Sequence, residues 1–171
     1  LSVSRGLGDV YKRQAYIKSI LFGGNMKKLL LAVIVSLSTV TTAALAEIKV
    51  GIILGFTGPI ESLTPAMRDG ARMAFDEASN SGNLLGGESI TILEADSTCV
   101  DSAAATAAAE DLVAQGVTAI MGADCSGVTG AINANVAVPN GILMVSPSAT
   151  SPGLSKVPDN GTFWRTAPSD A

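Results

Sequence analysis

Hydroxyl side chains gather in two short segments of this chain, and these residues are the best suited to chemistry. Ser126 follows Cys125 at the start of a helix-like segment, and residues 146–152, SPSATSP, carry four hydroxyl groups and two stiffening prolines. A serine at a helix start lies beside unpaired backbone N–H groups, where a carboxylate can bind. A stiff, hydroxyl-rich loop holds a small polar ligand at low ordering cost. The alternatives are a helix cap at Ser126 and an ordinary turn over 146–152.

Histidine is absent from all 171 residues. This excludes Ser-His and Cys-His pairs from the chain and removes the commonest metal ligand. Cys125 and Ser126 therefore have no visible base, and we expect a binding protein rather than an enzyme, with no cofactor and no metal. The first loop, residues 55–59, lacks the G-x-G-x-x-G spacing of a dinucleotide site, and Pro59 interrupts its turn.

Residues 26–46, MKKLLLAVIVSLSTVTTAALA, have the three parts of a cleaved export signal. Two lysines follow Met26, residues 29–37 form a short apolar run, and Ala-Leu-Ala at 44–46 provides the cleavage site. The apolar run is about half of the roughly 20 residues that span a bilayer. We expect cleavage after Ala46 and a periplasmic mature protein.

Residues 1–25 precede the export signal and are left out of the expected fold. Residues 1–14 resemble translated sequencing-adapter read-through and residues 15–25 resemble translated upstream DNA; the alternative is a natural basic extension. Cleavage after residue 46 leaves 125 residues, enough for one compact core, with five basic and fourteen acidic side chains and a formal charge of −9. Such a domain repels phosphate backbones, so we expect no nucleic-acid binding.

Both cysteines of the chain, Cys99 and Cys125, lie in the part that is expected to be exported. An oxidising compartment makes a disulfide between them the default interpretation. The alternative is a pair of free, buried thiols.

Strand-like and helix-like stretches alternate after the signal, with short connections. Thr64 is expected to cap the first helix, with Pro65 at its first position, and Asp101 or Ser102 to cap the second. This order predicts an α/β fold with a doubly wound parallel sheet, whose ligands bind at the carboxyl ends of the strands. We expect strands at 49–56, 89–94, 117–121, 141–145 and 162–165, and helices at 64–80, 102–115 and 126–138.

Several segments of residues 47–171 together resemble the periplasmic binding proteins for leucine, isoleucine and valine that serve ABC transporters, which are type I solute-binding proteins. The resemblance is carried by IKVGIILGFTGPI at 48–60, the two cysteines, GILMVSPSATSP at 141–152 and FWRTAPSD at 163–170. It implies the first lobe of a two-lobed receptor, truncated before the second lobe, in which hinge closure buries the ligand. The cysteine pair coincides with the family's disulfide.

The resemblance also implies a set of ligand-binding residues. In the family, the serine after the second cysteine and the SPxAT loop bind the ligand's amino-acid head group, which points to Ser126, Ser148, Ala149 and Thr150. Leu63 takes the place of a tryptophan that contacts the ligand side chain in the best-known members, so ligand size is expected to differ.

The implied ligand is an amino acid, namely leucine, isoleucine or valine, and the implied partner is an ABC permease in the inner membrane. The receptor is expected to be a monomer. Its acidic partner for the ligand's α-ammonium lies in the second lobe, so we expect residues 47–171 alone to bind amino acids weakly or not at all. Trp164 is expected to pack rather than to contact the ligand. The alternative function is an extracytoplasmic sensing domain of a receptor or regulator with the same fold.

Overall fold

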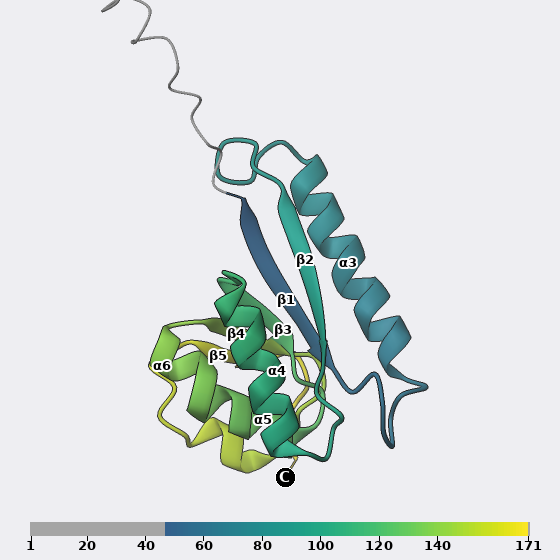
Figure 1. Cartoon of the computed structure of the whole chain (residues 1–171), viewed down its shortest axis with the longest axis vertical. Coiled ribbons are helices and arrows are strands. Elements are labelled where there is room, and N and C mark those ends of the chain that lie inside the picture. The colour runs from purple at the N-terminus through teal and green to yellow at the C-terminus, as the bar shows by residue number, and fades with distance from the viewer. Residues whose placement is uncertain (1–46, 171) are drawn as a thin grey trace, which may run out of the picture. The chain divides into compact units, whose positions relative to one another are not determined.

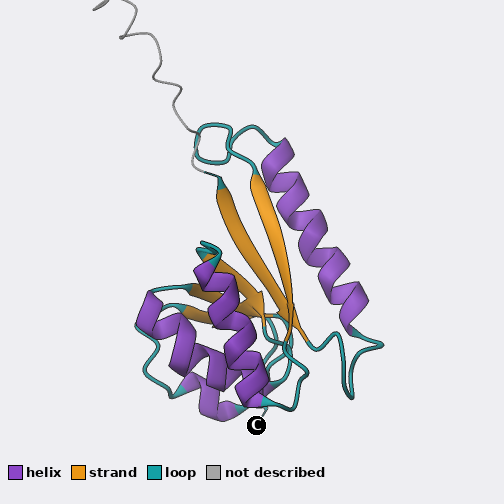
Figure 2. Cartoon of the chain, in the orientation of Figure 1, coloured by secondary structure: helices purple, strands orange, loops and turns teal. Residues whose placement is uncertain are grey.

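The structure is a computed structural model that describes residues 47–170. The expected export signal and the segment before it lie outside the described residues, so both remain predictions. Strands and helices alternate along the described chain (Figures 1 and 2). The strands are β1 (Ile48–Leu54), β2 (Ile90–Asp96), β3 (Ala119–Gly122), β4 (Leu143–Ser146) and β5 (Phe163–Arg165). The helices are α3 (Thr64–Asn80), α4 (Ser102–Ala114), α5 (Ser126–Ile132), the π-helix η1 (Asn133–Ala137), α6 (Val138–Asn140) and the 3₁₀ turn η2 (Pro152–Ser155).

All five strands are parallel and form one sheet in the order β2-β1-β3-β4-β5. The expected doubly wound α/β fold is confirmed. From β1 the chain adds β2 on one side of the sheet and then β3, β4 and β5 on the other side. The strands β1 and β3 are therefore neighbours in the sheet, although β2 lies between them in the sequence. In open parallel sheets this switch point opens the crevice in which ligands bind, beyond the carboxyl ends of the strands.

The main core lies between the sheet and the helices α4, α5 and η1, which cover one of its faces (Figure 1). Side chains alternate between the two faces of each strand, so Met144 is fully buried in this core while its neighbour Leu143 is 43% exposed. Packing of these apolar side chains fixes the positions of the strand ends that carry the site. The core cluster includes Ile53, Leu112, Ile120, Val128, Ile132, Met144 and Phe163.

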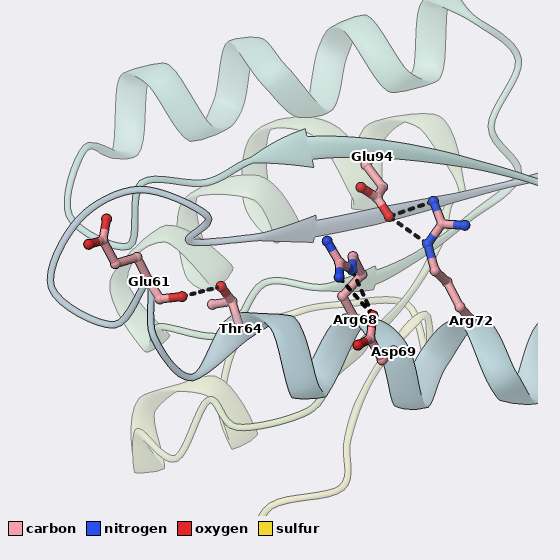
Figure 3. A network of polar contacts seen from close by, with 6 residues as sticks. All are labelled: Glu61, Thr64, Arg68, Asp69, Arg72 and Glu94. Carbon is pink, nitrogen blue, oxygen red and sulfur yellow. Dashed lines mark hydrogen bonds and ion pairs between the residues drawn. The ribbon is translucent and has the colours of Figure 1, made fainter.

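Asp101 caps helix α4 as the sequence predicts, because its carboxyl group accepts hydrogen bonds from the N–H groups of Ala103 and Ala104. The prediction that Thr64 caps α3 is wrong. Leu63 occupies the cap position without a side-chain bond, and the Thr64 hydroxyl donates backwards to the Glu61 carbonyl at 3.0 Å (Figure 3).

Helix α3 packs against β1 and β2 on the other face of the sheet. An ion pair between Arg72 and Glu94 of β2, with an N···O distance of 2.7 Å, joins the helix to the sheet (Figure 3). An apolar groove of about 520 Å³ lies between the helix and the sheet, and its lining includes Ala74 and Phe75 of α3 and Val145 of β4. Within residues 47–170, no helix is both long and apolar enough to cross a membrane.

Candidate ligand-binding edge of the sheet

The loops that follow β1, β3 and β4 meet at the carboxyl edge of the sheet. Asp124, after β3, accepts a hydrogen bond from the Gly55 N–H, after β1, at 2.7 Å. The hydroxyl of Ser148, after β4, donates to the Asp124 carbonyl at 2.9 Å. The structure therefore brings together the strand ends from which the sequence predicts a site.

Ser126 joins the third and fourth loops through its side chain. Its Oγ accepts hydrogen bonds from the N–H groups of Thr150 and Ser151, each at 3.1 Å. Cys125 holds the helix cap position, so the alternative that Ser126 acts only as a cap is wrong. A serine oxygen has two acceptor lone pairs, and both are used here. The hydroxyl proton is therefore the group with which Ser126 can bind a further partner, and that partner must be an acceptor.

The other expected site residues of the fourth loop differ in what they expose. Ala149 is fully buried, and its N–H donates to the Ser146 hydroxyl at 3.0 Å, so this residue shapes the loop from inside. The Thr150 hydroxyl donates to the Asp170 carboxyl at 2.8 Å, and the Asp170 N–H donates back to the Thr150 carbonyl. Ser148 is partly buried beside Met67 of α3, with 4.0 Å between Oγ and Sδ.

Arg165, the last residue of β5, also holds this loop through hydrogen bonds to its backbone. Its Nη1 donates to the carbonyl groups of Ala149 at 3.1 Å and Ser151 at 2.9 Å, and its Nη2 donates to the Ser155 hydroxyl. Hydrogen bonds from a charged donor are stronger than those between neutral groups. The hydroxyl-rich loop is thus fixed before any ligand arrives.

A disulfide joins Cys99 to Cys125, with 5.2 Å between their Cα atoms. The expected bridge is present, and the alternative of two free thiols is wrong. It connects the loop after β2 to the residue directly before Ser126. The β2 loop is therefore tied covalently to the site.

Asp96, at the end of β2, fixes the first loop. Its carboxyl group accepts hydrogen bonds from the Thr57 hydroxyl at 2.5 Å and from the Thr57 and Thr98 N–H groups. Partial burial raises the pKa of Asp96, but these hydrogen bonds outweigh it and hold the pKa below its usual 3.8. The two loops touch at Gly58, where a Cβ atom would lie 2.5 Å from the Thr98 carbonyl oxygen.

Leu63 lies just before α3 and is 58% exposed. Met67, one turn further along the helix, reaches Ser148, which places the start of α3 at the same edge. The expectation that Trp164 packs is wrong. Its ring is 62% exposed, and its Nε1 donates to the Gly161 carbonyl at 3.2 Å.

A sequence model of the family described as periplasmic binding protein matches residues 47–171. The chain belongs to the periplasmic binding protein family. The match begins at the residue that follows the expected signal cleavage site, and it includes every strand end described above. Solved structures of a transporter substrate-binding protein and of a leucine-binding protein are similar in fold to this chain, with TM-scores of 0.64 and 0.61.

Two amino-acid-binding proteins are among the curated relatives to which the chain is similar. The Leu/Ile/Val-binding protein BraC3 of Rhizobium johnstonii is 33% identical over 75% of this chain and 34% of its own length. The leucine-specific-binding protein of Salmonella typhimurium is 32% identical with the same coverage. The chain therefore spans about a third of the length of these relatives.

Among solved structures, the chain is similar to the branched-chain amino acid transporter substrate binding protein LivJ of Streptococcus pneumoniae, solved in complex with isoleucine. The TM-score is 0.64 and the identity is 31%, over 72% of this chain and 34% of that one. This likeness supports the α/β architecture expected from the sequence.

Sequence reasoning did not identify Asp124, Arg165 or Asp170 as parts of this edge. An acidic residue directly after an apolar strand and before a cysteine, as at Asp124, is a signal that could have been used, because a carboxyl group that becomes buried needs partners. Arg165 offers a weaker signal as the single basic residue of the last strand. Asp170 offers none, since its partner lies on another loop.

Proposed function

We propose that the chain is the ligand-binding first lobe of a periplasmic receptor that delivers an aliphatic amino acid, namely leucine, isoleucine or valine, to an ABC permease. The observation that carries the proposal is the geometry of the Ser126 hydroxyl. Its oxygen accepts hydrogen bonds from two backbone N–H groups of the SPSATS loop (residues 146–151), and its proton remains to be donated. A carboxylate is the acceptor in solution that gains most from such a donor in a partly buried site.

The ligand's carboxylate would bind at Ser126, with Ser148 and Thr150 beside it. The hydroxyl of Ser148 now donates to the Asp124 carbonyl, and that of Thr150 to the exposed Asp170. Either hydroxyl can rotate toward a ligand oxygen, and the rigid loop keeps the ordering cost of binding low. Leu63 would contact the ligand side chain and influence its size.

The second half of the site would come from a second lobe that closes over the first by a hinge motion. The relatives are about three times as long as the region of similarity, which leaves room for such a lobe. The second lobe would supply the acidic partner of the α-ammonium group. Export through residues 26–46 would place the receptor in the periplasm, where the Cys99–Cys125 bridge forms.

A thermal-shift experiment on the full-length gene product tests this function. A ligand that binds only the native state stabilises it, by about 2.7 kcal/mol when the ligand concentration is 100 times its Kd. This stabilisation raises the midpoint temperature of unfolding. Leucine, isoleucine or valine should raise the midpoint, while lysine and aspartate at the same concentration should not. A panel in which no aliphatic amino acid shifts the midpoint refutes the proposal.

A further inference from the structure

We infer that Asp124 is the positioning residue of this site: its buried carboxyl group locks the ends of three strands together directly behind Ser126. The inference rests on the proposed function for its ligand, and on the geometry of Asp124 for its mechanism. Asp124 itself is 3% exposed, so it acts through the residues that it holds.

The Asp124 carboxyl group accepts three hydrogen bonds, one from each of three loops. Oδ2 accepts from the Gly55 N–H at 2.7 Å, while Oδ1 accepts from the Ser97 hydroxyl at 3.1 Å and the Cys125 N–H at 3.0 Å. These partners follow β1, β2 and β3. The bond to Gly55 crosses from β3 to β1, which is the switch point of the sheet.

The backbone of Asp124 extends the same connection to the fourth loop, because its carbonyl accepts the Ser148 hydroxyl at 2.9 Å. The neighbouring Cys125 carries the disulfide, and the next residue is Ser126. One residue therefore links four strand ends. Ser126 can hold its position against the SPSATS loop only while the β3 end is fixed relative to β1 and β2.

Gly55 leaves little space at this contact. A Cβ atom on Gly55 would lie 3.3 Å from Asp124 Oδ2 and 3.2 Å from the Cys99 Cβ. The β1 loop therefore approaches the carboxyl group and the disulfide closely. Such close packing transmits a displacement of Asp124 to its neighbours without slack.

Asp124→Asn is the sharpest perturbation, because it keeps the shape of the side chain and changes one acceptor into a donor. If the amide oxygen takes the Oδ2 position, the Cys125 N–H faces an NH₂ group. If it takes the Oδ1 position, the Gly55 N–H does. In either orientation one backbone N–H loses its acceptor, fully buried at Gly55 or partly buried at Cys125, and an unpaired donor away from water is costly.

The matched control is Asp101→Ala. The Asp101 carboxyl group also accepts two backbone N–H bonds, but as the exposed cap of α4. Its loss lowers stability without moving the strand ends. Binding of leucine, isoleucine and valine is measured by calorimetry on the full-length gene product and on both variants, below the unfolding temperature of each.

We expect Asp124→Asn to weaken binding of the preferred amino acid by about tenfold or more, the equivalent of one lost hydrogen bond to a buried group. Asp101→Ala should bind like the wild type. The loss should also be non-additive with Ser126→Ala, because both changes act on the same hydroxyl. Wild-type affinity in a folded Asp124→Asn variant overturns the inference, as does a loss that adds fully to that of Ser126→Ala.

Two further measurements keep the test decisive. If Asp124→Asn does not fold, the variant Ser97→Ala takes its place, because it removes only the hydrogen bond from the Ser97 hydroxyl to Asp124. A severalfold loss of amino-acid affinity in this variant supports the inference, and no loss overturns it. If the wild type binds none of the three amino acids, the proposed function fails. Hydrogen exchange of the peptide containing Gly55 then decides about Asp124, since faster exchange in Asp124→Asn supports its positioning role and unchanged exchange refutes it.

Discussion

Reduction of the Cys99–Cys125 disulfide should both destabilise the protein and weaken its ligand site. The bridge closes a loop with a sequence separation of 26 residues. The chain-entropy relation assigns a loop of that length about 3.5 kcal/mol of stabilisation at 25 °C. The bridge thus contributes a large part of the stability of about 5 to 15 kcal/mol that is typical of a folded domain.

Backbone strain at the bridge lowers the expected net loss. Thr98 and Cys99 have φ angles of 56° and 69°, in the left-handed region that non-glycine residues seldom occupy. Each such residue costs about 1 to 3 kcal/mol where the surrounding structure enforces it, and reduction lets the turn relax. Thr98 keeps its N–H bond to Asp96 after reduction, so relief is expected at Cys99 only. Relief of up to about 1.5 kcal/mol there leaves an expected net loss of about 2 to 3.5 kcal/mol.

Urea unfolding of the mature protein, with and without reductant, measures this loss. With an m-value of about 2 kcal/mol/M, the midpoint should fall by about 1 to 1.7 M in reductant. The control is the double variant Cys99→Ser/Cys125→Ser, whose midpoint should be low and insensitive to reductant. Equal midpoints for oxidised and reduced wild type refute the reasoning. Ligand affinity should fall in parallel, because the bridge ends next to Ser126.

Three further perturbations test individual parts of the edge. Ser126→Ala in the full-length protein should weaken amino-acid binding by about 1 to 3 kcal/mol, measured by calorimetry, because it removes a donor to a charged group; unchanged affinity contradicts the assigned role. Gly122→Ala should destabilise the fold by about 3 kcal/mol or more in urea unfolding, since φ is +133° and the new Cβ would overlap the Ile53 carbonyl oxygen. Gly70→Ala, in open space on α3, is the control and should not destabilise. Asp96→Asn should lower the free energy of unfolding above about pH 4, because the pKa of Asp96 in the folded protein lies below the usual 3.8. The difference from wild type should vanish as the pH falls through that lower pKa. A difference that persists at lower pH would count against the argument.

The order and approximate bounds of the main elements were predictable because their signals are local. The apolar run that forms β1, the proline in the first turn of α3 and the Asp101 cap of α4 each depend on a few neighbouring residues. Parallel pairing followed from the alternation of strands and helices. The loops with hydroxyl groups could then be assigned to one edge of the sheet.

The contacts that organise the edge were not predictable, because they join residues far apart in the sequence. Asp124 and Gly55 are separated by 69 positions, and Arg165 bonds a loop 14 to 16 residues earlier. The direction of the Ser126 hydroxyl also depends on tertiary structure. A serine that caps a helix and a serine that binds the backbone of a distant loop cannot be told apart from the local sequence. Trp164 was placed wrongly for the same reason, since no local pattern shows that the edge strand β5 leaves its ring exposed.

The central claim is that a carboxylate-bearing aliphatic ligand binds at the Ser126 hydroxyl. The most direct test is calorimetric titration with leucine, isoleucine and valine, together with titration of the carboxamide of whichever amino acid binds best. The full-length wild-type protein should bind that amino acid at one saturable site. The amide, which keeps the side chain and the ammonium group but has no negative charge for Ser126, should bind about tenfold more weakly or worse. Equal binding of the acid and its amide, or no binding of any of the three amino acids, contradicts the account.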